Sequence, residues 1–322
     1  MTKMHRVVIS FFLLLSAAAQ HGCVTVNLVE PPGPVQEVQL SGSGDGKVLL
    51  LDLSGVISSQ DQDGLIPQPN VLATFKEELT KASKDEKIKA IVLRINSPGG
   101  TVNASDILYH ELKTFKATKK IPVIASMMDV AASGGYYLAM ATDAILVHPS
   151  TVTGSIGVIM LTVNAKGLLE KVGVEASAIT SGPRKDMGSP FRTMTSEEKE
   201  IFQGVIDSFY HRFLTVVQEG RPQLSADQIK KLADGRIYSG EQAKAAGLVD
   251  EIGYLDEAIE LAKKNAGLTE ARVVTYRRHG EYQNNIYSRL FGTGSGLSSL
   301  ARMDLLSIVR GGSPQFMYLW MP

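Results

Sequence analysis

The chain contains little cysteine and no surplus of either charge. Cys23 is its only cysteine, which excludes an internal disulfide and a zinc site built from cysteines, so the fold must be held together by packing. The 33 lysines and arginines balance 33 aspartates and glutamates, which gives a formal net charge of zero. A general nucleic-acid-binding protein needs a basic surplus to contact phosphates, so nucleic acid is not expected as a partner.

Histidine is also scarce. The six histidines are scattered, without an H-E-x-x-H motif or another paired spacing, so we expect no metal site and no other cofactor. A Gly-x-Ser-x-Gly motif is missing as well, which argues against an α/β-hydrolase. Apolar residues nevertheless make up 44% of the 322 residues, enough to exclude a disordered chain and to build a large buried core.

A nearly unbroken apolar run, Val7–Ala19, lies near the start of the sequence behind a short basic segment. Its 13 residues are fewer than the about 20 that a transmembrane helix needs. A basic head, a short apolar core and small residues after it are typical of a secretory signal peptide, which we predict over residues 1–22.

Two cleavage sites compete behind this run, and an uncleaved anchor is the third alternative. Ala17 and Ala19 suit the ordinary signal peptidase. Gly22 followed by Cys23 suits lipoprotein processing, which would leave a lipid on Cys23, although Gln20 stands where such signals usually have leucine. The position of the sole cysteine directly after a small residue favours the lipid anchor. All three alternatives place the body of the protein in the cell envelope, outside the cytoplasm, and the favoured one anchors it to the membrane through Cys23.

Periodicity along the rest of the chain predicts an α/β fold. Residues 23–46 are expected to form a flexible tether, because proline, glycine and serine are frequent from residue 30 onward. Apolar runs then alternate with helical patterns, which predicts a parallel sheet with helical crossovers. The expected strands are 47–53, 88–95, 121–127, 144–147, 174–180 and 272–276, and the expected helices are 71–84, 104–115, 134–141, 195–219, 226–233, 240–246 and 254–265.

Two features refine this organisation. Thr195 and Glu198 have the spacing of a capping box, which marks the start of the long helix. The main domain is expected over residues 47–268, followed by a C-terminal extension over 269–322 that ends in the apolar stretch Phe316–Trp320. An apolar terminus normally docks, here on its own body or on a neighbouring subunit.

Three segments rich in glycine or small residues follow expected strands. Asn96–Gly100 has two glycines at a strand-to-helix turn, where they direct backbone N–H groups at an oxyanion or simply make a tight turn. Ala131–Tyr137 places Ser133 at the start of a helix, as a nucleophile beside free N–H groups or as an ordinary N-cap. Thr153–Val158 either shapes a cleft or lets backbones pack closely.

A fourth segment, Ser181–Pro190, is a loop that contains Lys185. An exposed loop lysine is normally solvated and without function, whereas a catalytic lysine has to be partly desolvated so that it can lose its proton. A peptidase needs a nucleophile, a base and a site for the oxyanion. A serine–lysine pair can replace the triad that contains histidine, so these segments together could supply all three.

In their order and spacing, the four segments resemble the signature of the signal peptide peptidase A family, in its short bacterial form with a single repeat, within the ClpP/crotonase superfamily. The separation of 52 residues between Ser133 and Lys185 (185 − 133) matches the Ser–Lys pair of that family. Gly235–Gly240 and Gly247–Asp250 are similar to its closing segments. The resemblance covers about residues 47–268, together with the terminal Met317–Trp320.

The resemblance implies a ClpP/crotonase-like fold, with a parallel sheet of repeated β-β-α or βαβ units and flanking helices. It implies a serine endopeptidase that cleaves apolar peptides such as remnant signal peptides, with Ser133 as nucleophile and Lys185 as general base. The N–H groups of Gly134 and of Gly99 or Gly100 would form the oxyanion hole.

The chain departs from the family in two ways. Many members have a plain transmembrane anchor where this chain has Cys23. The second domain of the double-repeat members is absent, so the chain would find its partners by assembly, as a homo-oligomer.

Two other functions remain open on the same fold. A crotonase-type enzyme acting on an acyl thioester would use the oxyanion hole but would leave Ser133 and Lys185 without a role. A catalytically inactive binding or scaffold protein would be favoured by the loss of either residue, and both are present.

Overall fold

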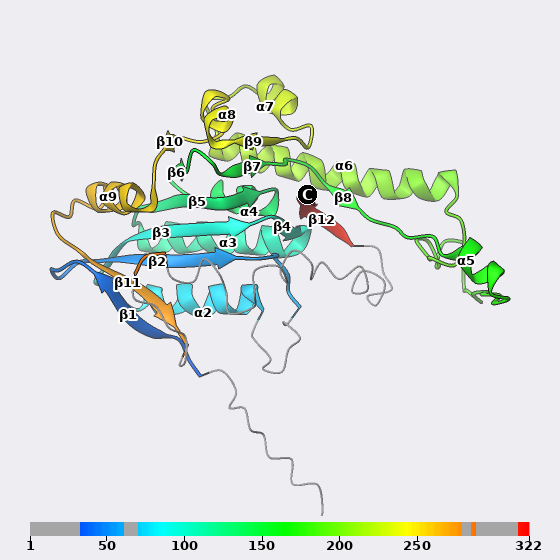
Figure 1. The fold of residues 1–322 in the computed structure, drawn as a ribbon, viewed down its shortest axis with the longest axis horizontal. Coiled ribbons are helices and arrows are strands. Elements are labelled where there is room, and N and C mark those ends of the chain that lie inside the picture. Colours follow the sequence, from blue (N-terminus) through cyan, green and yellow to red (C-terminus); the bar gives the residue numbers. More distant parts are fainter. Residues whose placement is uncertain (1–32, 61–69, 279–284, 288–314, 322) are drawn as a thin grey trace, which may run out of the picture.

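A sheet with helices on both faces forms the body of the protein in the computed structural model, which describes residues 33–60, 70–278, 285–287 and 315–321 (Figure 1). The predicted signal peptide and Cys23 lie outside these residues. The nine strands of this sheet are β1 Gln36–Ser41, β2 Lys47–Ser54, β3 Ile88–Ser97, β5 Val123–Ala132, β6 Ala144–Val147, β7 Val152–Gly154, β9 Ile237–Ser239, β10 Glu251–Ile252 and β11 Arg272–Arg277. The predicted α/β architecture is confirmed.

The sheet is mostly parallel. Its strands follow the order β1-β11-β2-β3-β5-β6-β10, while β7 pairs with β5 and with β9. Within it, only β1–β11 and β7–β9 are antiparallel pairs among the described strands. The helices are α2 Val71–Ser83, α3 Val102–Lys119, α4 Gly134–Ala139, α5 Lys166–Lys171, α6 Ser196–Gly220, α7 Ala226–Leu232, α8 Gly240–Ala245 and α9 Leu255–Asn265.

The central strands are apolar on both faces because helices cover both sides. Along β2, Leu49 and Leu51 belong to the larger apolar cluster with α2, α3 and α4, whereas Val48 and Leu50 belong to a second cluster with α9. Successive side chains of a strand point to opposite faces, so a strand buried on both faces reads as an unbroken apolar run. This explains why the apolar run Leu49–Leu53 predicts a strand.

A second, smaller sheet lies at the edge of this body. It has the order β4-β12-β8, with β4 Gly99–Thr101, β8 Ile159–Met160 and β12 Phe316–Leu319, all paired antiparallel. The apolar C-terminal stretch is therefore docked on its own chain. Tyr318 is fully buried, its ring stacks on that of Tyr137 at 5.1 Å, and its hydroxyl donates to the carbonyl oxygen of Phe209 at 2.7 Å.

Residues 161–195, which we call the arm, connect β8 to α6 and carry α5. Figure 1 shows α5 beyond the N-terminal end of the long helix α6 and away from the sheet. The capping box predicted at Thr195 and Glu198 is present at the start of α6.

The arm corrects one prediction. The strand expected at 174–180 is not formed, and these residues are exposed, including Val174 and Ile179. A stretch of this kind becomes a strand only where a neighbouring strand can pair with it. No strand of the described chain pairs with this stretch.

The expected tether needs a second correction. Residues 36–41 are not a linker but form β1, which pairs with β11 from Gln36↔Arg277 to Ser41↔Val273. The glycine and serine content of 42–46 belongs instead to the turn that leads into β2. No described helix is long and apolar enough to cross a membrane.

Candidate active site

Ser133 lies at the junction of β5 and α4 in a strained backbone conformation. Its φ of 51° and ψ of −113° are unusual for a residue with a side chain, and such conformations persist only where the surroundings enforce them. The side chain makes no capping hydrogen bond, so the ordinary N-cap interpretation does not hold. The residue is 1% exposed, and its N–H donates to the carbonyl oxygen of Gly154 at 2.7 Å.

The glycines of Asn96–Gly100 lie directly beside this junction. Gly99 has a φ of +100°, and a Cβ built on it would lie 2.6 Å from the backbone nitrogen of Gly134. Two segments that are 35 residues apart in the sequence (134 − 99) therefore meet at their backbones. Only glycine permits both the conformation and this close approach.

The third segment, Thr153–Val158, supports the strand that carries Ser133. β7 continues the sheet beside the end of β5, with Thr153 opposite Ala131 and Gly154 opposite Ala132. The Thr153 hydroxyl donates to the carbonyl oxygen of Ala131 at 2.7 Å. The close backbone packing that was one interpretation of this segment is present, and it supports the end of β5 next to Ser133.

The candidate oxyanion donors are not equivalent. As the first residue of α4, Gly134 has an N–H without an acceptor in the helix, and no hydrogen bond from it to another described residue is found. The N–H of Gly99 donates to the hydroxyl of Ser97 at 3.1 Å, and that hydroxyl donates to the carbonyl oxygen of Gly55 at 2.6 Å. Ser97 thus fixes the glycine turn, a role that spacing alone did not reveal.

The C-terminal strand lies across the same glycines. β12 pairs with β4 through Leu319↔Gly99 and Tyr318↔Gly100, and it pairs with β8 on its other side. A Cβ on Gly99 would collide with the carbonyl oxygen of Tyr318. The backbone edge next to Ser133 is therefore occupied by an extended apolar segment of the chain itself.

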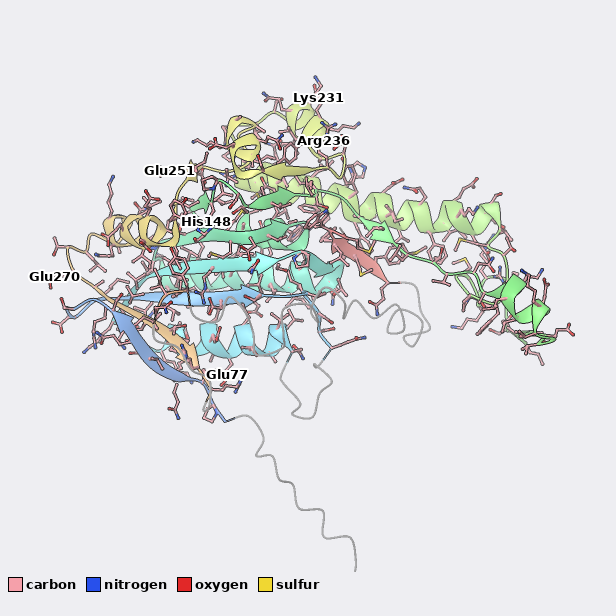
Figure 2. The ribbon with its side chains drawn as sticks, viewed as in Figure 1. Glu77, His148, Lys231, Arg236, Glu251 and Glu270 are labelled. Atoms are coloured by element: carbon pink, nitrogen blue, oxygen red, sulfur yellow. The ribbon has the colours of Figure 1, made fainter. Side chains whose placement is uncertain are left out.

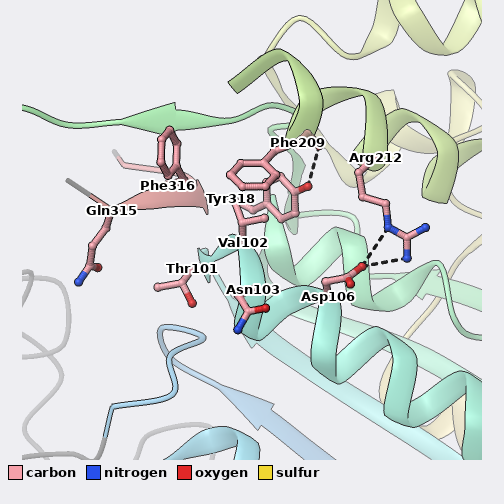
Figure 3. Close-up of a pocket in the computed structure, with 9 residues that line it drawn as sticks. All are labelled: Thr101, Val102, Asn103, Asp106, Phe209, Arg212, Gln315, Phe316 and Tyr318. Atoms are coloured by element: carbon pink, nitrogen blue, oxygen red, sulfur yellow. Dashed lines mark hydrogen bonds and ion pairs between the residues drawn. The ribbon is translucent and has the colours of Figure 1, made fainter. Parts of the chain in front are cut away.

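A cavity of about 380 Å³ opens beside this strand (Figure 3). Thr101, Phe209, Phe316 and Tyr318 are among the residues that line it, together with the ion pair between Asp106 and Arg212, whose guanidinium donates to the carboxylate at 2.9 Å. Its walls combine aromatic rings from α6 and β12 with the start of α3. The cavity can therefore accept an apolar side chain next to the glycine strand.

Lys185 is exposed and lies in the arm. The neighbouring Asp186 accepts two hydrogen bonds from Arg192, each of 2.7 Å. Arg192 also donates to Glu198 in the first turn of α6, at 2.9 Å. The loop that carries Lys185 is therefore attached to the N-terminal end of α6.

Ser133 lies toward the other end of that helix. Phe213 of α6 packs against Tyr137 of α4, with ring centroids 5.0 Å apart. From Glu198 to Phe213 there are 15 residues (213 − 198), about 22 Å at 1.5 Å per residue. The structure therefore brings Ser133, Gly99 and Gly134 together, but it does not bring Lys185 of the same chain to Ser133.

Among the described residues, no hydrogen bond joins a histidine to Ser133. His148 follows β6 in the body of the protein (Figure 2), where its ring lies 5.2 Å from that of Tyr254. Burial lowers the pKa of His148, and no hydrogen bond joins it to Ser133 in the described structure. Among the described residues there is also no cluster of three side chains that could hold a metal ion.

Comparisons with known proteins relate the chain to a family of peptidases. Residues 115–269 match Peptidase family S49. Over 243 residues, the chain is 38% identical to a protein of Enterococcus faecium assigned as a signal peptide peptidase SppA, covering 75% of this chain and 70% of that protein. A protein of Methanocaldococcus jannaschii assigned as a protease is 36% identical over 259 residues, covering 76% of this chain and 81% of that protein.

A plant relative and two solved structures are also similar. The chloroplast serine protease SPPA of Arabidopsis thaliana is 36% identical over 84% of this chain, which spans 41% of that protein. The 1510-N membrane-bound stomatin-specific protease matches with 17% identity and a TM-score of 0.43, covering 68% of this chain and 85% of that one. A ClpP1 mutant from Listeria monocytogenes matches with 19% identity and a TM-score of 0.43, covering 65% of this chain and 94% of that one.

The sequence relatives define the class of this protein as a serine peptidase. The chain belongs to peptidase family S49, with the SppA proteins among its relatives.

The close approach at Gly99 gives a first prediction. Gly99→Ala should lower the free energy of unfolding by about 2 kcal/mol or more, and kcat/KM by about tenfold or more, because its methyl group would meet Gly134 and Tyr318 at a strained φ. Gly55→Ala is the matched control, because its φ is +79° but nothing lies within 4 Å, so strain alone should cost about 1 kcal/mol. Urea unfolding and peptide hydrolysis measure both, and equal effects would contradict the close approach.

Proposed function

We propose that this protein is a serine endopeptidase that uses Ser133 as nucleophile and Lys185 as general base. The observation that carries the proposal is the strained Ser133 at the start of α4, beside the free N–H of Gly134 and the glycines of β4. A serine held at a strained strand-to-helix junction, with N–H groups next to it, supplies two of the three parts that acyl transfer requires, a nucleophile and donors for the oxyanion.

The reaction proceeds in two halves. The Ser133 oxygen attacks the peptide carbonyl carbon while neutral Lys185 takes the hydroxyl proton, and the resulting oxyanion is stabilised by the N–H of Gly134 and of Gly99 or Gly100. Lys185 then gives the proton to the leaving amine, which leaves an acyl-enzyme. Lys185 then takes a proton from water, which attacks the ester, and it returns that proton to the Ser133 oxygen as the acid product leaves. If Gly99 is the second donor, its bond to Ser97 has to be exchanged for the oxyanion.

The proposed substrates are apolar peptides in extended form, such as remnant signal peptides. β12 supports this, because an apolar segment already lies antiparallel along β4, where main-chain pairing gives affinity and side-chain pockets give selectivity. In the proposed complex a substrate takes the position that β12 occupies, and its side chains replace Phe316 and Tyr318 beside Thr101 and Phe209.

We further propose that the active sites are shared between neighbouring copies in a homo-oligomer. Lys185 and Ser133 of one chain lie toward opposite ends of α6, whereas the arm carries exposed apolar side chains, including Leu168, Val172 and Ile179. Such an arm gains stability by docking on another copy, and a head-to-tail contact of this kind can close into a ring. Docking would also remove water from around Lys185, which is exposed in the single chain. A lysine that acts as a base has to be partly desolvated in this way.

Labelling with a serine-reactive probe tests the proposed function. A fluorophosphonate should modify the full-length protein at a single serine, and mass spectrometry of the digested protein should map it to Ser133. Labelling of another serine, or hydrolysis of peptides without any labelling, would contradict the assignment.

Membrane attachment through Cys23 stays a proposal about a residue outside the described structure. Mass spectrometry of the mature protein should find a diacylated or triacylated N-terminus that begins at Cys23. An unmodified first residue at Gln20 would instead show cleavage after Ala19.

A further inference from the structure

Charged side chains flank Lys185 in the sequence, and they pair with other charged groups on the arm and on the first turn of α6. Arg184 pairs with Glu197, and Arg192 lies between Asp186 and Glu198. Together with Lys185 itself, these groups are three cations and three anions, so their formal charges cancel (3 − 3 = 0). On α5, which is linked to the loop by the Ala165 N–H that donates to the carbonyl oxygen of Pro190, Lys166 pairs with Glu170.

Arg192 differs from the other cations because it holds two carboxylates at once. Its Nε and one terminal nitrogen donate to the two oxygens of Asp186, both at 2.7 Å. Its terminal nitrogens also donate to the two oxygens of Glu198. Side-chain exposure is 31% for Arg192, 24% for Asp186 and 5% for Glu198, so this contact is far better shielded than the Arg184–Glu197 pair at 55% and 66%.

The second carboxylate is itself fixed to the helix. Glu198 accepts a hydrogen bond from the N–H of Thr195 at 2.9 Å, and the Thr195 hydroxyl accepts one from the N–H of Glu198. Arg192 is therefore the link between the capping box of α6 and the residue adjacent to Lys185. Local turn bonds, such as that from Ser189 N–H to the Asp186 carbonyl oxygen at 3.1 Å, complete the loop.

We propose that Arg192 is a positioning residue for catalysis, which fixes the Lys185 loop to α6 and keeps the negative charge of Asp186 away from the Lys185 ammonium. The inference rests on the proposed role of Lys185 as general base. A free carboxylate next to Lys185 would favour its charged form and so remove the neutral amine that has to accept the Ser133 proton. With Asp186 bound by the planar guanidinium, that effect is largely cancelled.

The two carboxylates that Arg192 holds stay charged at neutral and alkaline pH. The hydrogen bonds to Arg192 lower the pKa of Asp186, and those to Arg192 and Thr195 lower the pKa of Glu198 to about 2. Both carboxylates are thus ionised at neutral and alkaline pH. A change in the acidic limb of the pH–activity profile in that range therefore reports on Lys185 and not on the link itself.

The test is the pH dependence of kcat/KM for a fluorogenic apolar peptide, using the full chain and active-site concentrations titrated with a serine-reactive probe. Arg192→Gln should move the acidic limb to higher pH by about half a unit or more, as expected for one uncompensated charge near Lys185. Adding Asp186→Asn to Arg192→Gln should move the limb back toward that of the wild type. Arg184→Gln is the matched control and should shift the limb less, because its pair is exposed and screened.

Further variants separate charge from loop geometry. Arg192→Lys keeps the charge but cannot form the same planar fork, so it should lower kcat with little movement of the limb. Asp186→Asn alone should leave the acidic limb of the pH profile at its wild-type pH or move it to lower pH. If Arg192→Gln folds poorly, this variant tests the effect of the Asp186 charge instead.

Each outcome decides for or against the link. An unmoved limb in Arg192→Gln, or a uniform fall in kcat/KM at all pH values, would overturn the proposal, because Arg192 would then only support the loop or have no role. If Asp186→Asn does not reverse the shift, the charge argument is wrong. Failure of the proposed function itself is a separate result, which would appear as activity in Ser133→Ala or, for the general base, as activity in Lys185→Arg.

Discussion

Ser133→Ala is expected to lower kcat/KM for an apolar peptide by about a thousandfold or more, because the proposed mechanism forms the acyl-enzyme on the Ser133 oxygen. The substitution removes one oxygen that makes no capping hydrogen bond and leaves the backbone strain unchanged, since alanine at a φ of 51° is strained much as serine is. The free energy of unfolding should therefore stay within about 1 kcal/mol of the wild type. A variant that is folded but inactive would show that the loss of kcat/KM comes from the chemical step and not from unfolding.

Ser126→Ala is the control for Ser133→Ala. Ser126 lies on the same strand, is fully buried, and its hydroxyl has no hydrogen-bond partner among the described residues. Removing an unpaired buried hydroxyl should keep or raise stability and should leave kcat/KM unchanged. Near-wild-type turnover in purified Ser133→Ala, or a comparable loss in Ser126→Ala, would contradict the assignment of the nucleophile.

The body of the fold could be predicted from the sequence because its signals are local. Runs such as Leu49–Leu53 alternate between two apolar clusters, and the Thr195–Glu198 spacing marks the start of α6. The strand predicted at 174–180 was wrong because β-propensity depends on a partner strand, which the arm does not provide. β1 was missed because it is a half-exposed edge strand preceded and followed by proline and glycine.

The site could be predicted only in part, for a similar reason. Glycine-rich turns after strands indicated where Ser133, Gly99 and Gly134 would meet, since the carboxyl ends of parallel strands share one edge of a sheet. No local signal placed β12 against β4, because pairing over more than 200 residues of sequence depends on the tertiary fold. Nor could spacing tell that Lys185 would lie toward the other end of α6 from Ser133.

The distance between these residues makes Lys185 the subject of the second prediction. Lys185→Ala and Lys185→Arg should both lose about a thousandfold or more in kcat/KM near neutral pH, because arginine keeps the charge but cannot act as a base in this range. Activity of the wild type should rise with pH, since an ordinary lysine has a pKa of about 10.4 and only its neutral form can accept the Ser133 proton. Lys171→Ala, which removes another arm lysine, is the control and should remain active.

Mixing inactive protomers then shows whose lysine serves each serine. If Ser133 of one copy is paired with Lys185 of its neighbour, co-assembled Ser133→Ala and Lys185→Ala chains should recover activity, with about a quarter of the sites intact for random one-to-one mixing in a ring. If each chain supplied both residues, every site would lack one of them and the mixture would stay inactive. An active monomer in light scattering would contradict the shared site directly.

A Lys185→Arg variant with most of its activity would show that the reaction uses the positive charge and not proton transfer, which would remove the general base from the proposed mechanism.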